Sequence, residues 1–148
     1  MEKEYTRMDK AIQHLDLSIK LYFEKKEYSA VILLAGSSEE LIKAQLIERG
    51  IKTPFGVVKF ELSEEKNIEI KEVAKDINRV KTWLKHGSEP TCKFDENEEA
   101  LQMIIRAIAA FQACHGGILK EHFEFIKFLK DNRPDLYNYN LEEIKVIE

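Results

Sequence analysis

The sequence contains few residues that break helices, with only 6 glycines and 3 prolines in 148 residues. A fold made of many short strands needs frequent turns, so this scarcity favours long helices. Long apolar runs are also missing, because charged residues make up 34% of the chain and interrupt the 44% that are hydrophobic. This balance is too apolar for a disordered chain and too charged for a membrane span. We therefore expect a soluble all-α protein.

A strong net charge and a cysteine framework are absent as well. The chain has 23 basic and 27 acidic residues, a net charge of −4, so any site for an anion must be local. The two cysteines, Cys92 and Cys114, do not make a disulfide framework and should be reduced thiols. The segment MEKEYTRMDK has no apolar run behind it, which predicts no secretory signal. We expect a cytoplasmic protein that does not engage a membrane.

Hydrophobic periodicity predicts one helical domain over residues 1–148, with a core at about 5–130 and a C-terminal tail at 131–148. Apolar residues recur at three- and four-residue steps, which line one side of a helix, in five segments: about 4–26, 27–50, 68–86, 95–114 and 118–133. In residues 51–67, Pro54 and Gly56 interrupt the period and predict a loop, with or without a short extended or helical piece. The expected fold is an antiparallel four-helix bundle with an additional C-terminal helix, because most connections are short.

The predicted helix 68–86 carries a local surplus of positive charge in an acidic protein. Residues 71–86 include five Lys or Arg and two acidic residues. On a wheel of about 100° per residue, Arg79 and His86 project in nearly the same direction, roughly opposite the apolar stripe. The same segment supplies the other candidate ligands for a phosphate or nucleic acid: Lys75, Asn78, Lys81, Thr82 and Lys85.

An arginine and a histidine on one helix face suit chemistry at a phosphate. The arginine can hold a phosphate through two parallel hydrogen bonds, and the histidine can move protons near neutral pH. In phosphodiester cleavage, His86 would act on the ribose 2′-hydroxyl or the leaving oxygen while Arg79 stabilises charge on phosphorus, with no metal or cofactor. The alternative is a solvated basic face on which His86 lies at a helix C-terminus, where positive charge is favourable. Short patterns recur by chance, so both interpretations stay open.

Two segments together resemble the HEPN superfamily (higher eukaryotes and prokaryotes nucleotide-binding). They are AVILLAGSSEELIKAQLIERG at 30–50 and INRVKTWLKHG at 77–87, and the likeness extends over roughly residues 11–126. Members are similar small helical bundles with a second helix rich in small residues and an Arg, four to six residues, His motif near the end of the third. Arg79 and His86 match the widest form of this motif. Many members have Arg and Asn in a closer register, where this chain has Lys81 and Thr82.

The resemblance implies a homodimer in which both motifs line one cleft. Ribonuclease activity is what it implies for the Arg79 and His86 pair, although several members are catalytically silent. Both the Arg79 register and the Lys81 register remain candidates.

Two glutamates interrupt the apolar segment 27–50. Glu40 lies on its apolar stripe, where an unpaired buried carboxylate would be costly. It would either pair with Arg79 or His86 and so orient the site, or lie with Glu39 at a partly exposed rim. His115 and His122 have no evident third ligand, so we expect no metal site there.

These observations lead to two hypotheses from different classes. The first is a homodimer that binds RNA or a nucleotide through Arg79 and His86, with metal-independent ribonuclease activity as an extension. The second is a non-catalytic helical module that assembles with itself or with a cognate protein through the apolar surface around Trp83, Phe111 and the last helix.

Overall fold

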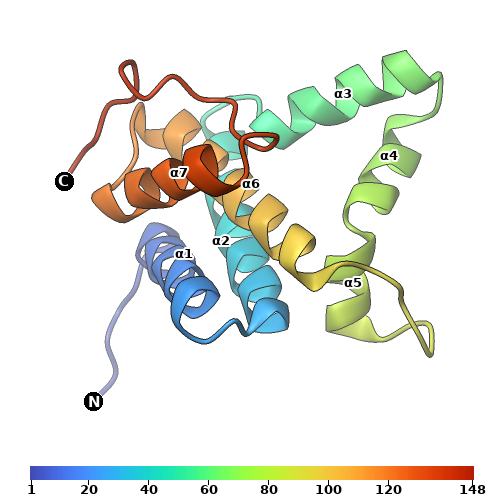
Figure 1. The fold of residues 1–148 in the computed structure, drawn as a ribbon, viewed down its shortest axis with the longest axis horizontal. Helices are drawn as coiled ribbons and strands as arrows, with labels where there is room; N and C mark the ends of the chain where they lie inside the picture. The colour runs from blue at the N-terminus through green and yellow to red at the C-terminus, as the bar shows by residue number, and fades with distance from the viewer.

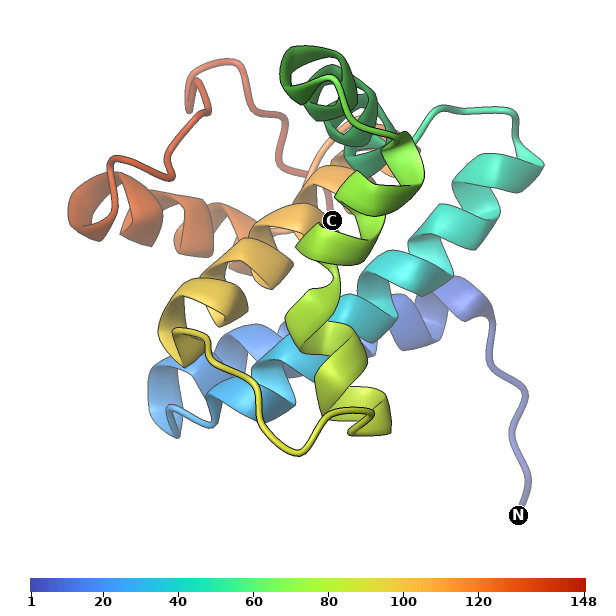
Figure 2. The same cartoon turned by 90° about the vertical axis from the view of Figure 1, so that its right-hand side faces the viewer.

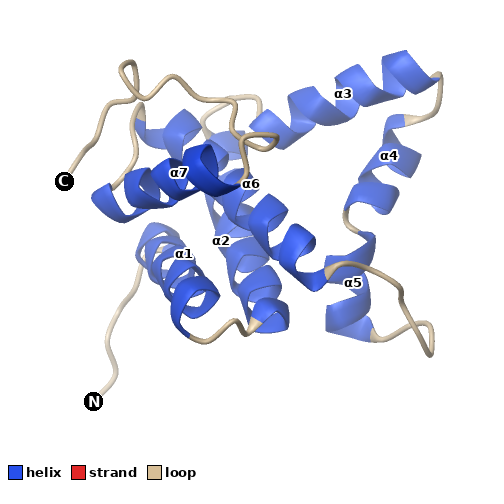
Figure 3. Ribbon diagram, viewed as in Figure 1, coloured by secondary structure: helices blue, strands red, loops and turns tan.

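Seven helices and no strands make up the computed structural model, which describes residues 1–148 (Figure 1 and Figure 3). The prediction of an all-α protein is therefore confirmed. None of the helices combines the length and the apolar character that crossing a membrane requires. The helices are α1 (Arg7–Glu24), α2 (Tyr28–Glu48), α3 (Pro54–Lys66), α4 (Ile70–Ile77), α5 (Arg79–His86), α6 (Glu96–His115) and α7 (Lys120–Asn132).

The centre of the fold is α2, which packs against both α1 and α6 (Figure 1). Its first half is apolar on most sides, and Val31, Ile32 and Ala35 are fully buried. Leu15 from α1 and Phe125 from α7 belong to the same core. Fully burying each such large side chain stabilises the fold by about 1.5–3 kcal/mol. Hydrophobic periodicity predicts the positions of α1, α2, α6 and α7 along the chain, but not the buried face of α2. That face carries Ile42, Leu46 and Glu39. Glu40, which we expected on the apolar stripe, is exposed.

The segment at 51–67, predicted as a loop, is instead largely the 13-residue helix α3. Pro54 occupies the first helical turn, where its missing N–H costs nothing because that position has no partner within the helix. The hydroxyl oxygen of Thr53 caps the helix by accepting a hydrogen bond from the Gly56 N–H at 2.9 Å. Pro54 therefore begins a helix here and does not interrupt one.

The predicted single helix 68–86 is also wrong, because it is divided into α4 and α5 at Asn78. Asn78 leaves the helical conformation, with φ −91° and ψ 5°, and its side-chain oxygen accepts a hydrogen bond from Arg106 Nη2 at 3.1 Å. Figure 2 shows α4 and α5 lying in front of the α2 and α6 pair. The apolar stripe runs through both helices, which is why periodicity alone indicates one.

Helices α3 and α4 form an arm, residues 54–77, that projects from the bundle (Figure 1). We call it the α3–α4 arm. The large apolar side chains that are exposed on this arm are Val57, Val58, Phe60, Ile68 and Ile70. The arm therefore carries several exposed apolar side chains, although Leu17 and Phe23 on α1 and Ile47 on α2 are exposed as well. Phe111, which we expected on an exposed apolar surface, is 1% exposed and belongs to the core.

The C-terminal tail contacts the bundle near the start of α7. The Ile118 N–H donates to the Lys145 carbonyl at 2.9 Å, and the Ile147 N–H donates to the Ile118 carbonyl at 2.8 Å. Gly117 makes this approach possible, because a Cβ atom at that position would lie 2.7 Å from the Lys145 carbonyl oxygen. The tail also brings Tyr139 into a partly buried position, and this burial raises the pKa of its hydroxyl to about 12.

A second glycine contact fixes how closely α5 approaches α2. A Cβ atom at Gly36, in the middle of α2, would lie 2.7 Å from Cδ of Lys81 and 3.4 Å from Cε of Met103. Lys81 is only 8% exposed, so its hydrocarbon stem has little room to move away. The glycine therefore provides the space that the Lys81 stem occupies.

We expect Gly36→Ala to lower the free energy of unfolding by roughly 1–3 kcal/mol through overpacking, although alanine favours a helix by about 1 kcal/mol relative to glycine. Urea denaturation measures the change. In a Lys81→Ala background the same substitution should be neutral or stabilising, because the crowded atoms are gone. An equal loss of stability in both backgrounds would contradict the proposed contact.

Candidate functional site

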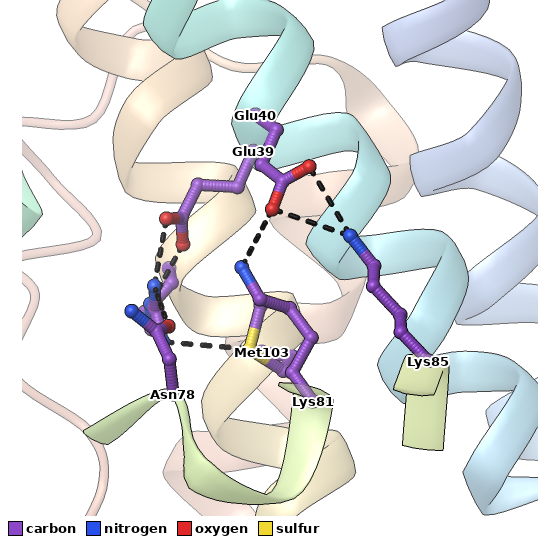
Figure 4. A network of polar contacts seen from close by, with 7 residues as sticks. Glu39, Glu40, Asn78, Lys81, Lys85 and Met103 are labelled. Carbon is purple, nitrogen blue, oxygen red and sulfur yellow. Dashed lines mark hydrogen bonds and ion pairs between the residues drawn. The ribbon is translucent and has the colours of Figure 1, made fainter. Parts of the chain in front are cut away.

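Two groups of polar residues flank α5. The first, which we call the ion-pair network, joins α5 to α2 and α6 through Glu39, Glu40, Asn78, Lys81, Lys85 and Arg106 (Figure 4). The second lines a hollow between α4, α5 and the loop 87–95 that follows α5. Each candidate residue from the sequence except His86 belongs to one of these two groups.

Glu39 and Arg106 form the buried part of the ion-pair network. Arg106 Nη2 donates to Glu39 Oε1 at 2.8 Å, and Arg106 Nε lies 2.7 Å from Oε2. The Glu39 side chain is 6% exposed and the Arg106 side chain is 14% exposed. Arg106 also binds Asn78 and lies over the ring of Phe55, 3.8 Å from its centroid. One guanidinium group thus connects α2, α3, α6 and the joint between α4 and α5.

Arg106 is the residue of this network that sequence reasoning did not single out. It follows Ile104 and Ile105 in an otherwise apolar stretch of α6. A cation there needs a buried anion, since an unpaired charge in the core is costly. The sequence therefore contains a signal for this ion pair: an arginine in an apolar stretch of α6 and a glutamate in an apolar stretch of α2.

Glu40 lies at the more open end of the network, with its side chain 49% exposed. Lys81 Nζ donates to its Oε1 at 2.9 Å, and Lys85 Nζ lies 3.3 Å from both oxygens. Burial raises the pKa of the Glu40 carboxyl, but the hydrogen bonds and charges of Lys81 and Lys85 outweigh burial and lower the pKa overall. The predicted pairing of Glu40 with Arg79 or His86 is therefore wrong, because two lysines one turn apart on α5 face it instead.

The network also engages three of the residues predicted to bind phosphate. Lys81 is buried against Glu40, Lys85 shares the same carboxylate, and Asn78 accepts from Arg106. Residues 71–86 contain three more basic than acidic residues, and the Glu40 carboxylate from α2 reduces this local excess of positive charge to two. The basic composition of α5 thus partly serves to attach it to α2.

The remaining candidates, apart from His86, lie around a hollow of about 310 Å³ between α4, α5 and the loop 87–95. We call it the α5 hollow. It brings together three of the predicted residues, Lys75, Arg79 and Thr82. Its full lining is Lys75, Arg79, Thr82, Trp83, Ser88, Glu89, Thr91 and Cys92.

Arg79 faces the loop 87–95. Its Nη1 donates to Cys92 Sγ at 3.0 Å and its Nη2 donates to the Lys93 carbonyl at 3.0 Å. Nearby Glu99 is half-buried, and burial raises the pKa of its carboxyl while the charges of Arg79 and Arg106 oppose that rise. Arg79 is thus positioned by the loop, with a carboxylate on the α6 side.

His86 is exposed at the last residue of α5 and does not line the α5 hollow. His86 lies seven positions after Arg79, which corresponds to about 10 Å along the helix axis. The shared direction that the helical wheel predicts does not bring the two side chains to one point. Within one chain, the hollow collects Arg79, Lys75 and Thr82 but leaves His86 outside.

The other histidines do not form a metal site. No group of three or more His, Cys, Asp or Glu side chains is placed to hold a metal ion. His122 is fully buried, packs edge-on against Phe111, and has Nδ1 3.3 Å from the Leu119 N–H. His122 thus packs in the interior and helps to cap α7.

Comparison of the chain with protein-family models, with curated proteins and with solved structures gave no match. The structure supports a small all-helical domain of seven helices and assigns no family. The chemistry of the α5 hollow is therefore the basis for inferring a function.

The two glutamates of α2 should differ sharply in their effect on stability. We expect Glu39→Gln to cost about 3–5 kcal/mol, because it leaves the buried Arg106 charge without its partner. Glu40→Gln, one residue away, should cost about 1 kcal/mol or less, because that ion pair is half-exposed and screened by solvent. Urea denaturation of both variants at neutral pH tests this, and similar losses would show that burial does not distinguish the pairs.

The Glu40 pairing should also depend on pH in a defined direction. A carboxyl whose pKa is lowered by folding contributes stability above its ordinary value of 4.5, and that contribution is lost as the pH falls through the lowered pKa. The difference in unfolding free energy between wild type and Glu40→Gln should therefore be constant above that value and shrink below it. A difference that grows on acidification would refute the pairing.

Proposed function

We propose that the α5 hollow binds a phosphate group of RNA or of a nucleotide. The observation that supports this most strongly is that Lys75, Arg79 and Thr82 line one hollow. A guanidinium, an ammonium and a hydroxyl group are the side-chain donors that proteins use for phosphate oxygens. Their convergence at one place is what a phosphate site requires.

Arg79 retains donors for a ligand after its contacts with the loop. A guanidinium group carries five N–H donors, and Arg79 uses one on Nη1 and one on Nη2. These two bonds fix the plane of the group before a ligand arrives, so less side-chain freedom is lost on binding. Lys75 is exposed and adds a second positive charge at the same hollow.

The acidic surroundings indicate a site that works through a few directed hydrogen bonds. Glu72 and Asp76 line a smaller hollow together with Lys75 and Arg79, so they reduce the local positive potential. An extended basic surface of the kind that binds duplex nucleic acid without sequence preference is therefore not the expected mode. One or two phosphates of a short or unpaired ligand fit this site better.

Ribonuclease activity, which the resemblance to HEPN proteins implies, is a further part of this proposal and would depend on a second copy. A general acid or base must come within about 2.6–3.2 Å of the proton it moves, whereas His86 lies about 10 Å along α5 from Arg79. A phosphate on Arg79 would therefore meet His86 from the other protomer of a homodimer. Binding would not need that arrangement, but cleavage would.

The exposed apolar residues of the α3–α4 arm favour the second candidate function, an assembly module. Val58, Phe60 and Ile70 are each 44–47% exposed, and large apolar side chains left exposed on one part of a protein can mark a contact with another protein. A homodimer or a cognate protein would be its partner in this interpretation. The two proposed functions use different surfaces, so substitutions in the α5 hollow and substitutions on the α3–α4 arm distinguish them.

Arg79→Ala should weaken binding of a labelled single-stranded RNA by about tenfold or more, because it removes a charge-assisted phosphate contact. Fluorescence anisotropy at several salt concentrations measures the affinity, and the salt slope should fall by about 0.7 for the lost phosphate contact. Lys85→Ala is the matched control, since Lys85 is a basic residue of the same helix that faces Glu40. His86→Ala should leave binding intact and abolish cleavage.

An RNA affinity that Arg79→Ala and Lys75→Ala leave unchanged would exclude the α5 hollow as the phosphate site. Equal losses for Lys85→Ala and Arg79→Ala would indicate a general charge effect instead. If neither RNA nor nucleotide binds while Phe60→Ser dissociates an oligomer, the assembly module is the better description.

A further inference from the structure

The α5 hollow contains two groups that a simple phosphate site does not need. Trp83 offers an aromatic surface, and Glu89 adds an acidic residue beside Lys75 and Arg79. A carboxylate repels a phosphate, so its presence disfavours a small anion as the only ligand. Both groups are useful to a ligand that carries an aromatic ring with N–H donors in addition to its phosphate.

The loop that forms one wall of the hollow is attached to α5 at two points. Trp83 Nε1–H donates to the main-chain carbonyl of Glu89 at 2.8 Å, and Arg79 binds Cys92 Sγ and the Lys93 carbonyl. Phe94 packs edge-on against Trp83, with ring centroids 6.1 Å apart. The indole and the loop are thus fixed in place without a ligand, which lowers the entropic cost of binding.

The two attachment points also divide the hollow into two ends. Arg79 and Trp83 are four residues apart on α5, or about 6 Å along the axis. A phosphate held by Arg79 and Lys75 would therefore leave the rest of the same nucleotide next to Trp83 and Glu89. A volume of about 310 Å³ lies at the small end of ligand pockets, which suits one nucleotide and excludes a duplex.

We infer that the α5 hollow takes one unpaired guanine nucleotide, free or within single-stranded RNA. The base stacks on Trp83 and the Glu89 carboxylate accepts hydrogen bonds from its N1–H and exocyclic N2–H. Guanine alone among the RNA bases presents two adjacent N–H donors on its pairing edge, which match the two oxygens of a carboxylate. Glu89 is exposed, so its carboxylate is accessible to such an edge. This inference rests on the proposed function, because it uses the same phosphate end of the hollow.

The single tryptophan of the chain makes the test direct, since its fluorescence reports on this hollow alone. The protein is titrated with GMP, IMP, AMP, CMP, UMP and inorganic phosphate. GMP should quench Trp83 and bind roughly tenfold or more tightly than the other three standard nucleotides, the usual scale for a bidentate base contact. IMP, which lacks only the exocyclic amino group, should bind several-fold more weakly than GMP.

Two variants separate the base contacts from the phosphate contacts. Glu89→Gln should remove the preference for GMP while leaving AMP binding unchanged, whereas Glu61→Gln, an exposed glutamate on α3, should change nothing. Trp83→Leu, measured by calorimetry, should weaken all nucleotides roughly tenfold through lost stacking and leave inorganic phosphate unaffected. An unpaired RNA containing guanine should behave as GMP does, and the same strand in a duplex should not quench Trp83.

The outcomes distinguish this inference from the proposed function. Equal affinity for GMP, IMP and AMP, or nucleotide binding without a change in Trp83 fluorescence, overturns guanine recognition, and if Arg79→Ala still weakens that binding, the phosphate site stands. If no nucleotide or RNA binds and Arg79→Ala has no effect, both are refuted. If RNA quenches Trp83 but free GMP does not, the guanine is recognised only within a strand.

Discussion

The attachment of α5 to the bundle depends above all on the buried pair of Glu39 and Arg106. Arg106 holds Asn78 at the joint between α4 and α5, while apolar contact between α5 and the core comes mainly from Val80, which is 2% exposed. Buried ion pairs add little net stability compared with apolar contacts, but losing one partner is costly. Such a pair therefore fixes the position of α5 more than it strengthens the fold, and the direction in which Arg79 faces follows from it.

The basic residues of α5 serve two separate purposes on two sides of the helix. Lys81 and Lys85 reach Glu40 on α2, and the stem of Lys81 fills the space left by Gly36. Arg79 faces the loop on the other side. Because a lysine that is paired internally contributes little to an external site, a count of positive charges along the sequence overestimates the strength of the anion site. The acidic residues around Lys75 reduce it further, so recognition has to come from directed bonds and from the shape of the hollow.

The sequence predicts the parts of this fold that depend on burial and fails where one tertiary contact decides. The helices α1, α2, α6 and α7 are predictable because a buried helix must repeat its apolar residues, but α2 is apolar on most sides and its period does not show which side is buried. The break at Asn78 is not visible, because the apolar period continues across it and only the hydrogen bond from Arg106 indicates the joint. The sequence predicts an interruption at Pro54 because a proline in a helix interior and one in the first turn of a helix look alike in sequence.

The candidate site shows the same division. Helical geometry predicts Lys75, Arg79 and Thr82 on one side of the segment 68–86, and they line one hollow although the segment is divided into α4 and α5. The partner of Glu40 was not predictable in this way, since the choice between Arg79 and Lys81 depends on how α5 is rotated against α2. The sequence does not predict Trp83 and Glu89 as neighbours in this hollow, because their contact runs through a main-chain carbonyl in the loop, which no side-chain pattern encodes.

Because His86 lies outside the α5 hollow, the proposed phosphate binding and the proposed cleavage would be physically independent. A single chain offers a hollow lined by Lys75, Arg79 and Trp83, with no histidine among its lining residues. Any copy that supplies a histidine has to be held in a defined position. The arm that carries the exposed residues Val58, Phe60 and Ile70 is joined directly to α5 through Asn78. Assembly through that arm would therefore set the distance between the hollow of one protomer and His86 of its partner. The binding and assembly hypotheses, which began as alternatives, then describe two steps of one arrangement, in which assembly determines whether a bound nucleotide is also cleaved.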